Sequence, residues 1–230
     1  MNTVRGARER ARTEVAAAIK DEARRMLAAE GAARLSLRAV AREVGMVSSA
    51  LYRYFPSRDD LLTALIIDAY DSLGAAAEGA DEASGELRPR ERWNAVCAAV
   101  RGWALAHPHE FALVYGSPVP GYAAPQDTVG PASRVAECLI GVVRAAHAGE
   151  GLDRPPLPAG LRAEAERMTA DFAEGLPPEA TAALVAAWAQ LVGLLSFELF
   201  GQFHRVVEDR DAFYAHAADR LAGEVGLRAA

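Results

Sequence analysis

The sequence predicts an all-α fold with a small N-terminal helical domain, residues 1–58, and a larger helical domain, residues 59–230. Three observations support this prediction. Apolar residues recur at intervals of three and four, as on the buried side of a helix. No run in the larger domain alternates polar and apolar residues with period two, as a half-buried strand would. Glycine or proline stands where the periodic stretches end, for example at Gly31, Gly45 and Pro56.

The chain begins with a basic stretch followed by a helix. Residues 1–12 contain little apolar content, and we interpret them as a frayed arm. Residues 13–30 have apolar side chains at helical spacing and end at Gly31, so we expect a helix that supports the elements after it. The arginines of the arm are Arg5, Arg8, Arg10 and Arg12.

Residues 36–55 predict two short helices around a tight turn. From Leu37 to Val44 the apolar residues recur at i, i+3, i+4 and i+7, and Ser36 is placed to cap the first turn. Gly45 follows, where a left-handed residue would close the helix. This stretch therefore has the pattern of a helix-turn-helix.

The second of these helices has two contrasting faces. Ser48 is a candidate N-cap, and the expected buried stripe is Val47, Leu51 and Phe55. The other face carries hydroxyls and a guanidinium, which can hydrogen-bond to base edges and phosphates. The side chains on that face are Ser48, Ser49, Tyr52 and Arg53.

The motif continues into the next helix, where Ser57 to Asp60 predict an N-cap with acidic residues in the first turn of a helix that runs to about Gly74. Three elements stand between Ala39 and Leu62: A-x-x-V-G, A-L-Y-x-Y-F and S-R-D-D-L-L. They resemble the helix-turn-helix of the TetR-like transcriptional repressors. One departure is Val47, at a position where that family usually has a capping Ser or Thr.

The resemblance implies roles for individual residues. Arg38 would reach a guanine, whose O6 and N7 accept from an arginine fork. The base-reading start of the second helix would be Ser48, Ser49 and Ala50. The phosphate contacts would be Tyr52, Tyr54, Arg58 and the cap Ser36, with core packing as the alternative for Tyr54. The basic arm is either a solvated tail or a segment that follows the DNA backbone or enters the minor groove.

The larger domain is predicted to be a series of helices after a boundary at residues 74–90. We expect helices at residues 91–106, 109–115 and 129–148, a further helix that ends near Gly175, and two more at residues 180–197 and 210–225. A proline-rich loop at residues 116–122 is of the kind that edges binding sites. The resemblance implies that the last two long helices form a homodimer with their copies.

Aromatic residues of the larger domain are candidates for a small-molecule pocket, because such pockets are mostly apolar with a few polar groups. Core packing is the alternative for each of them. The candidates are Trp103, Phe111, Tyr115, Tyr122, Phe172 and Trp188.

Residues 180–197 contain no charged side chain, which raises the question of a membrane span. We reject it, because small alanines dominate the stretch and polar residues interrupt it; a helix buried on most sides of a protein core explains it better. No cleavable signal begins the chain, so we expect a cytoplasmic protein with no membrane partner.

The charge distribution favours a nucleic-acid partner for the N-terminal domain. Residues 1–58 hold 12 Arg or Lys and 6 Asp or Glu, whereas the remainder holds 13 and 25. A basic domain attracts phosphates through counterion release. Cys97 and Cys138 have no metal-binding spacing, so we expect two reduced, buried thiols, with a redox pairing as the alternative.

Together these features predict a ligand-responsive transcriptional regulator, a repressor that binds a palindromic operator in double-stranded DNA as a homodimer. We expect no cofactor, no metal and no catalytic residue, because the five histidines are scattered and no nucleophile or phosphate-binding motif is present. The alternatives are a helical enzyme and a non-specific DNA-binding protein.

Overall fold

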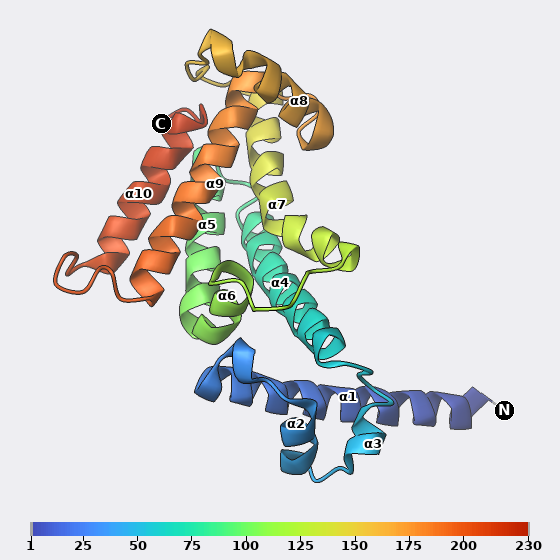
Figure 1. The fold of residues 1–230 in the computed structure, drawn as a ribbon. Coiled ribbons are helices and arrows are strands. Elements are labelled where there is room, and N and C mark those ends of the chain that lie inside the picture. Colours follow the sequence, from blue (N-terminus) through green and yellow to red (C-terminus); the bar gives the residue numbers. More distant parts are fainter. Residues whose placement is uncertain (1, 230) are drawn as a thin grey trace. The chain divides into compact units, whose positions relative to one another are not determined.

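The computed structural model describes residues 2–229, with side chains from residue 6 onward, so the terminal positions of the two predicted domains lie outside it. The all-α prediction is confirmed: the described residues form ten α-helices and three short 3-10 helices without a strand (Figure 1). In chain order these elements are α1 (Asn2–Glu30), η1 (Ala32–Arg34), α2 (Leu37–Glu43), α3 (Ser48–Leu51), α4 (Arg58–Ala83), α5 (Pro89–Ala106), α6 (Pro108–Tyr115), η2 (Gln126–Thr128), α7 (Val129–Ala148), η3 (Ala159–Leu161), α8 (Arg162–Phe172), α9 (Pro178–Leu199) and α10 (Arg210–Glu224).

Contacts divide the chain into two compact units. The head unit consists of Met1–Tyr70 and His107–Pro131, and the body unit of Asp71–Ala106 and Ala132–Ala230. Helix α4 contributes its first half to the head and its second half to the body. The division into domains after residue 58 stays a prediction.

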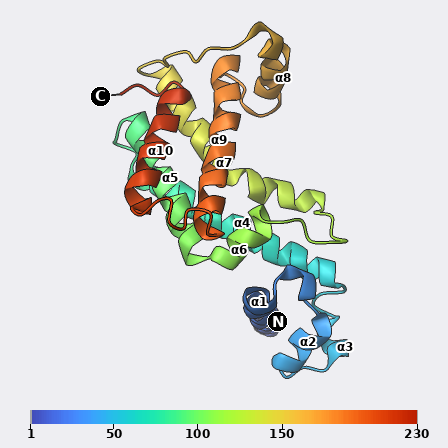
Figure 2. The same cartoon turned by 60° about the vertical axis from the view of Figure 1, so that its left-hand side comes forward.

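The head is built on a core shared by α1, α2, α3 and the start of α4. Ile19, Leu51 and Leu61 are completely buried in it. In both views α2 and α3 lie together beside α1 (Figures 1 and 2). The core therefore holds the two short helices in place, since neither is long enough to be stable alone.

Helix α6 and the loop after it also belong to the head. Leu113 and Val119 pack against the head core, and the hydroxyls of Tyr122 and Thr63 lie 2.9 Å apart. Arg24 donates from Nε to Glu110 across 3.0 Å. Sequence periodicity predicted this helix correctly but could not show which unit it joins.

The basic arm is helical rather than frayed, because α1 begins at Asn2 and not at residue 13. Alanine, arginine and glutamate favour helix, and a helix that is already anchored extends without a new nucleus. The side chain of Arg5 lies outside the described part of the chain. The other arginines of this stretch are exposed: Arg8, Arg10 and Arg12.

Helix α4 does not end near Gly74, as predicted, but continues to Ala83. The glycine admits a side chain of α7 rather than a turn: a Cβ at this position would lie 2.7 Å from Nε of Arg134. Arg134 binds Asp71 and Glu78, one turn before and after the glycine, at 2.8 and 2.6 Å. Gly74 therefore permits a close helix contact.

The body core joins α5 to α10. Trp93 is completely buried and donates from Nε1 to the carbonyl of Ala218 at 3.1 Å, while the Tyr214 hydroxyl donates to the carbonyl of Cys97 at 3.1 Å. Helices α9 and α10 run side by side in both views (Figures 1 and 2). The predicted helix at residues 129–148 is confirmed as α7.

Candidate nucleic-acid interface

The turn between α2 and α3 has the geometry that the glycine predicted. Gly45 has φ 74°, in the left-handed region. The Met46 amide donates to the carbonyl of Ala41 at 2.8 Å, and the Gly45 amide donates to that of Arg42 at 3.1 Å. These two bonds form a Schellman motif, which satisfies carbonyls at the end of α2 and turns the chain toward α3.

The start of α3 differs from the prediction. Val47, not Ser48, is the N-cap, with extended backbone angles and no side-chain hydrogen bond to the helix. Its side chain is 71% exposed, so the predicted buried stripe is wrong at Val47 and holds for Leu51 and Phe55. An N-cap precedes the helical residues, and helical spacing does not fix the direction of its side chain. Ser36 is the N-cap of α2 as predicted, but its hydroxyl makes no capping bond.

The regular part of α3 ends at Leu51, earlier than predicted, and tighter turns follow it. Amides of Arg53 and Tyr54 donate to the carbonyls of Ala50 and Leu51 at 3.2 and 2.8 Å. Such i→i+3 bonds tighten the last turn of a helix. Ser57 then caps α4: its Oγ accepts from the Asp60 amide at 3.1 Å, as the sequence predicted.

The predicted recognition face is accessible on these turns. Ser49, Tyr52 and Arg53 are exposed, while Ser48 and Ala50 are half-buried at the start of α3. Arg38 is exposed in the first turn of α2. The structure thus leaves hydroxyls and the guanidinium groups of Arg38 and Arg53 exposed, and their contacts with bases and phosphates stay predictions.

Tyr54 and Arg58 have structural partners. Tyr54 is half-buried and packs against the head core. The Arg58 guanidinium donates from Nε to the carbonyl of Leu35 at 3.1 Å and from Nη2 to that of Ala32 at 2.8 Å. Arg58 therefore connects α4 to the segment before α2, and its contact with phosphate stays a prediction.

Several cations of the head remain without an ion pair among the described residues. The cations that are paired lie elsewhere in the head, such as Lys20 and Arg24, which both bind Asp68. Unpaired guanidinium groups near the helix-turn-helix give this region a positive charge that the protein itself does not neutralise. The unpaired residues are Arg8, Arg10, Arg12, Arg34, Arg38 and Arg53.

The six candidate pocket aromatics are not gathered within one unit. Phe111, Tyr115 and Tyr122 are in the head, where the rings of Phe111 and Tyr115 lie 5.1 Å apart. The other three, Trp103, Phe172 and Trp188, are in the body. Burial raises the pKa of the Tyr115 hydroxyl, which keeps it neutral.

Each candidate in the body has a different environment. Trp103 is buried and donates from Nε1 to Ser72 Oγ at 2.9 Å, whereas Phe172 is 48% exposed and Trp188 is half-buried. None of the six candidates is among the residues that line four cavities in the described part of the chain. These candidates were selected as aromatic residues, and residue type does not indicate which of them face a common cavity.

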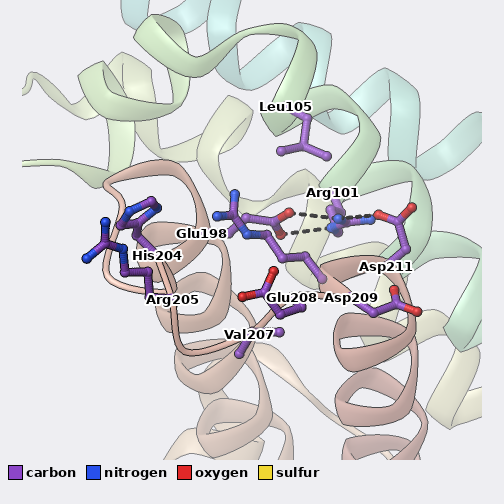
Figure 3. Close-up of a pocket in the computed structure, with 10 residues that line it drawn as sticks. Arg101, Leu105, Glu198, His204, Arg205, Val207, Glu208, Asp209 and Asp211 are labelled. Atoms are coloured by element: carbon purple, nitrogen blue, oxygen red, sulfur yellow. Dashed lines mark hydrogen bonds and ion pairs between the residues drawn. The ribbon is translucent and has the colours of Figure 1, made fainter.

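Sequence reasoning missed two cavities beside α9 and α10. One, of about 530 Å³, is lined by apolar side chains that include Phe197, Phe203 and Phe213, with the last two rings 5.5 Å apart. The other, of about 500 Å³, is polar (Figure 3). Clustered phenylalanines around residue 200 were the available signal for the first cavity.

An ion-pair network lines the polar cavity. Arg101 of α5 binds the two oxygens of Glu198 at 2.8 and 2.7 Å and Asp211 at 2.6 Å (Figure 3). These bonds raise the pKa of Arg101. Among the described residues no group of three or more His, Cys, Asp or Glu side chains is placed to hold a metal ion.

Helix α9 is long and apolar enough to cross a membrane by length and composition, with a mean hydropathy of 1.7 in its most apolar window. Only 33% of that window is buried within the described chain. The prediction of a helix buried on most sides is therefore wrong for a single copy. Its uncovered side chains include Val185 and Phe197.

The two cysteines are free thiols. Cys97 is buried, as predicted, but Cys138 is only half-buried. Burial raises the pKa of both thiols, that of Cys138 to about 11. Neither thiol is activated as a nucleophile, because the thiolate is the reactive form.

Comparison with known proteins agrees with this architecture. Residues 19–65 match the family described as bacterial regulatory proteins, tetR family, and residues 93–221 match the tetracyclin repressor-like C-terminal domain. The HTH-type transcriptional regulators Rv1816 of Mycobacterium tuberculosis (strain H37Rv) and Mb1846 of Mycobacterium bovis are each 41% identical over 207 residues, 86% of both chains.

Solved structures show the same fold. The structure of SCO4313, described as a regulatory protein, has a TM-score of 0.79 at 34% identity, covering 94% of this chain and 98% of that one. The regulator PfmR from Thermus thermophilus has a TM-score of 0.59 at 18% identity, covering 92% and 99%, and supports the fold alone. From its helix-turn-helix, its helical body and these relatives, the chain belongs to the TetR family of bacterial transcriptional regulators.

Proposed function

We propose that this regulator is a repressor that binds a palindromic operator as a homodimer and is released by a small apolar or aromatic effector. The observation that carries the proposal is the α2–turn–α3 geometry, which leaves Ser49, Tyr52, Arg53 and Arg38 exposed on a head with a buried core. A dimer of such heads reads two half-sites about one turn of B-DNA apart, roughly 34 to 36 Å.

Individual contacts follow from side-chain chemistry. Arg38 pairs with a guanine, and the Ala50 methyl contacts a thymine methyl beside Ser48 and Ser49. The hydroxyls of Tyr52 and Ser36 are free for phosphates, because no hydrogen bond within the described chain engages them. Tyr54 is half-buried against the head core and is a further candidate for a phosphate contact.

The uncovered surface of α9 and α10 supports the homodimer. Phe197 and Phe213 are 52% and 40% exposed beside the apolar cavity of about 530 Å³. Exposed apolar surface of this kind is covered in a stable soluble protein, and a second copy provides the same helices for a two-fold interface. This also explains the apolar composition of α9.

Release by an effector requires that it bind more tightly to a dimer whose heads do not fit DNA. The aromatic candidates of the body, Trp103, Phe172 and Trp188, and those of the head, Phe111, Tyr115 and Tyr122, are separate proposals for apolar contact with an effector. Helix α4 is a suitable coupling element, because its residues contribute to both units. The coupling free energy equals the difference in effector affinity between the two states.

The decisive experiment measures binding of the purified protein to the DNA upstream of its own gene, at two salt concentrations and against random-sequence duplex. We expect tight, salt-dependent and selective binding, with two chains on each site. Arg38→Ala should cost roughly 1 to 3 kcal/mol and relax preference at one base pair. Equal losses on operator and random DNA would remove the role of Arg38, and weak binding that is equal on both DNAs would contradict a local repressor.

A further inference from the structure

A cavity of about 440 Å³ lies within the head, between the end of α1 with η1 on one side and α6 with the loop after it on the other. We propose that this head cavity is a binding site for a neutral, mostly apolar small molecule that carries one hydrogen-bonding group. The inference rests on the proposed function only in taking that molecule as an effector, because its binding can be measured without DNA. Small-molecule sites typically have volumes of roughly 300 to 1,000 Å³, so the head cavity is large enough.

The lining of the head cavity is mostly apolar and contains no Asp, Glu, Lys or Arg side chain. Leu27 lines it from the core of the head, whereas Pro118 and Pro120 line it from the exposed loop. Three other cavities, two beside α9 and α10 and one lined by α1 and α3, each contain at least one arginine. A charged ligand would lose its hydration in the head cavity without gaining an ionic partner, so the lining favours a neutral molecule.

Two polar side chains of the lining are available to a ligand. The His109 ring and the Ser117 hydroxyl are exposed, and no hydrogen bond within the described residues engages either of them. Both groups can donate or accept a hydrogen bond. A mostly apolar pocket with a few polar groups orients its ligand through those groups, so we expect the ligand to carry a hydroxyl or a carbonyl.

The proline-rich loop that forms one wall is anchored at both ends. The Gly116 amide donates to the carbonyl of Ala112 at 3.0 Å, and a Cβ at Gly116 would clash with that oxygen, so glycine permits the close turn at the end of α6. At the other end of the loop, the hydroxyls of Tyr122 and Thr63 lie 2.9 Å apart. The wall is therefore held against α4 and α6, which keeps the head cavity from closing by movement of the loop alone.

The opposite wall is the turn that leads to the helix-turn-helix. Ala32 and Ala33 line the head cavity and belong to η1. Arg58 donates to the carbonyl of Ala32 at 2.8 Å, and α2 begins shortly afterwards at Leu37. A molecule in the head cavity would thus contact the segment that positions α2. A difference in its affinity between two arrangements of this segment would change the affinity for DNA.

The test uses 2-naphthol, a neutral two-ring molecule with one hydroxyl, and measures its binding to the full chain by equilibrium dialysis near neutral pH. Ala33→Phe and Ala112→Phe each add a ring to the lining and should remove most of the binding. The matched control is Ala29→Phe, which adds the same ring at an exposed position of α1 outside the lining and should leave the affinity unchanged. Circular dichroism and thermal midpoints check that the variants remain folded.

A comparison of ligands tests the expected chemistry and does not depend on the two filling variants. Naphthalene lacks the hydroxyl and should bind roughly three- to tenfold more weakly than 2-naphthol, the loss expected for one hydrogen bond. The double variant His109→Ala/Ser117→Ala should remove this difference. The anion 2-naphthoate should bind at least about tenfold more weakly than 2-naphthol, because the lining offers no cation.

The outcomes separate this inference from the proposed function. Binding of 2-naphthol that persists in both filling variants, or that falls equally in Ala29→Phe, would overturn the head cavity as the site, and so would the absence of binding to the unaltered chain at about 1 mM. Equal affinities for 2-naphthol and 2-naphthoate would overturn the neutral class of ligand. Failure of the chain to bind the DNA upstream of its gene would instead refute the proposed function, without altering the dialysis result.

Discussion

The arginines of the head and those of the body differ in how often they form ion pairs. Six arginines of the head have no ion pair among the described residues, and they lie in α1 and around the helix-turn-helix. In the body most arginines bind carboxylates, often on another helix. Those residues are Arg88, Arg90, Arg92, Arg101, Arg134, Arg154, Arg167, Arg220 and Arg228.

This difference explains the uneven charge of the chain. Carboxylates of the body accept from arginines that join α5 to α10, as in Arg90–Asp219, or α7 to α4, as in Arg134–Glu78. The acidic excess therefore supplies partners for helix packing. In the head, the arginines that we expect to contact phosphates have no carboxylate partner among the described residues. Removing an arginine should therefore lower stability in the body and weaken DNA binding in the head.

The largest effect is expected at Arg101, whose replacement leaves a buried carboxylate without its partner. The side chains of Arg101 and Glu198 are only 14% and 5% exposed. Breaking a buried pair at one end is strongly destabilising, so Arg101→Met should lower the free energy of unfolding by about 3 kcal/mol. Urea denaturation at fixed protein concentration measures this, and the salt slope of DNA binding should stay unchanged.

Arg167 provides the matched control for this prediction. It also binds two carboxylates, Glu164 and Asp171, but all three lie on α8 and are exposed. Exposed pairs contribute little, because water already solvates the charges. Arg167→Met should leave the urea midpoint unchanged, and a loss equal to that of Arg101→Met would show that burial is not the cause.

Arg58 differs from the unpaired arginines of the head, because its donors bind backbone carbonyls. Charge-assisted bonds of this kind stabilise the fold, so Arg58→Met should lower the free energy of unfolding by about 1 to 2 kcal/mol. The salt slope should not change, in contrast to the loss of about one that a phosphate contact predicts. Arg34→Met, at an unpaired and exposed head arginine, should not alter stability; a lowered slope in Arg58→Met would restore the phosphate role.

The sequence predicted the order of the helices because their ends are marked locally. Gly45 adopts the left-handed angle that closes α2, and Ser57 caps α4 by the bond expected from its spacing. The sequence could not show the features that depend on contacts between residues distant in the chain. Helix α4 passes Gly74 because Arg134 lies against it, and Arg58 binds carbonyls 23 and 26 positions earlier.

The candidate site was predictable as a motif but not residue by residue. Helical spacing placed Leu51 and Phe55 in the core, yet the same rule placed Val47 there, where it is exposed. A cavity of about 580 Å³ in the head is lined by Arg53 together with Arg8 and Arg12, which are distant from it in the chain, whereas the sequence predicted a frayed basic arm. Pocket aromatics were chosen by residue type, which does not distinguish core from cavity.

The smallest expected effect is the pH dependence of stability that comes from the Arg90–Asp219 ion pair between α5 and α10. Hydrogen bonds from Arg90 and Asn94 lower the pKa of Asp219 to about 2, with a smaller contribution from His216. In the unfolded chain the carboxyl has its ordinary pKa of roughly 3.9, so it binds a proton more readily there. Its contribution to stability is therefore complete above about pH 4 and is lost as the pH falls toward about 2.

Asp219→Asn should consequently lower the free energy of unfolding near neutral pH and lose its effect in acid. The side chain is 44% exposed, so solvent screening limits the difference to about 1 kcal/mol or less. The difference between the urea midpoints of the two proteins should be smaller at about pH 3 than at about pH 6. The control Glu86→Gln removes a charge from an exposed carboxylate of the body that has no ion pair among the described residues, and it should give the same small difference at both pH values. If Asp219→Asn behaved like this control, the Arg90–Asp219 pair would not stabilise the packing of α5 against α10. The head and the body would then differ in where their unpaired arginines lie, but not in what their ion pairs contribute to stability.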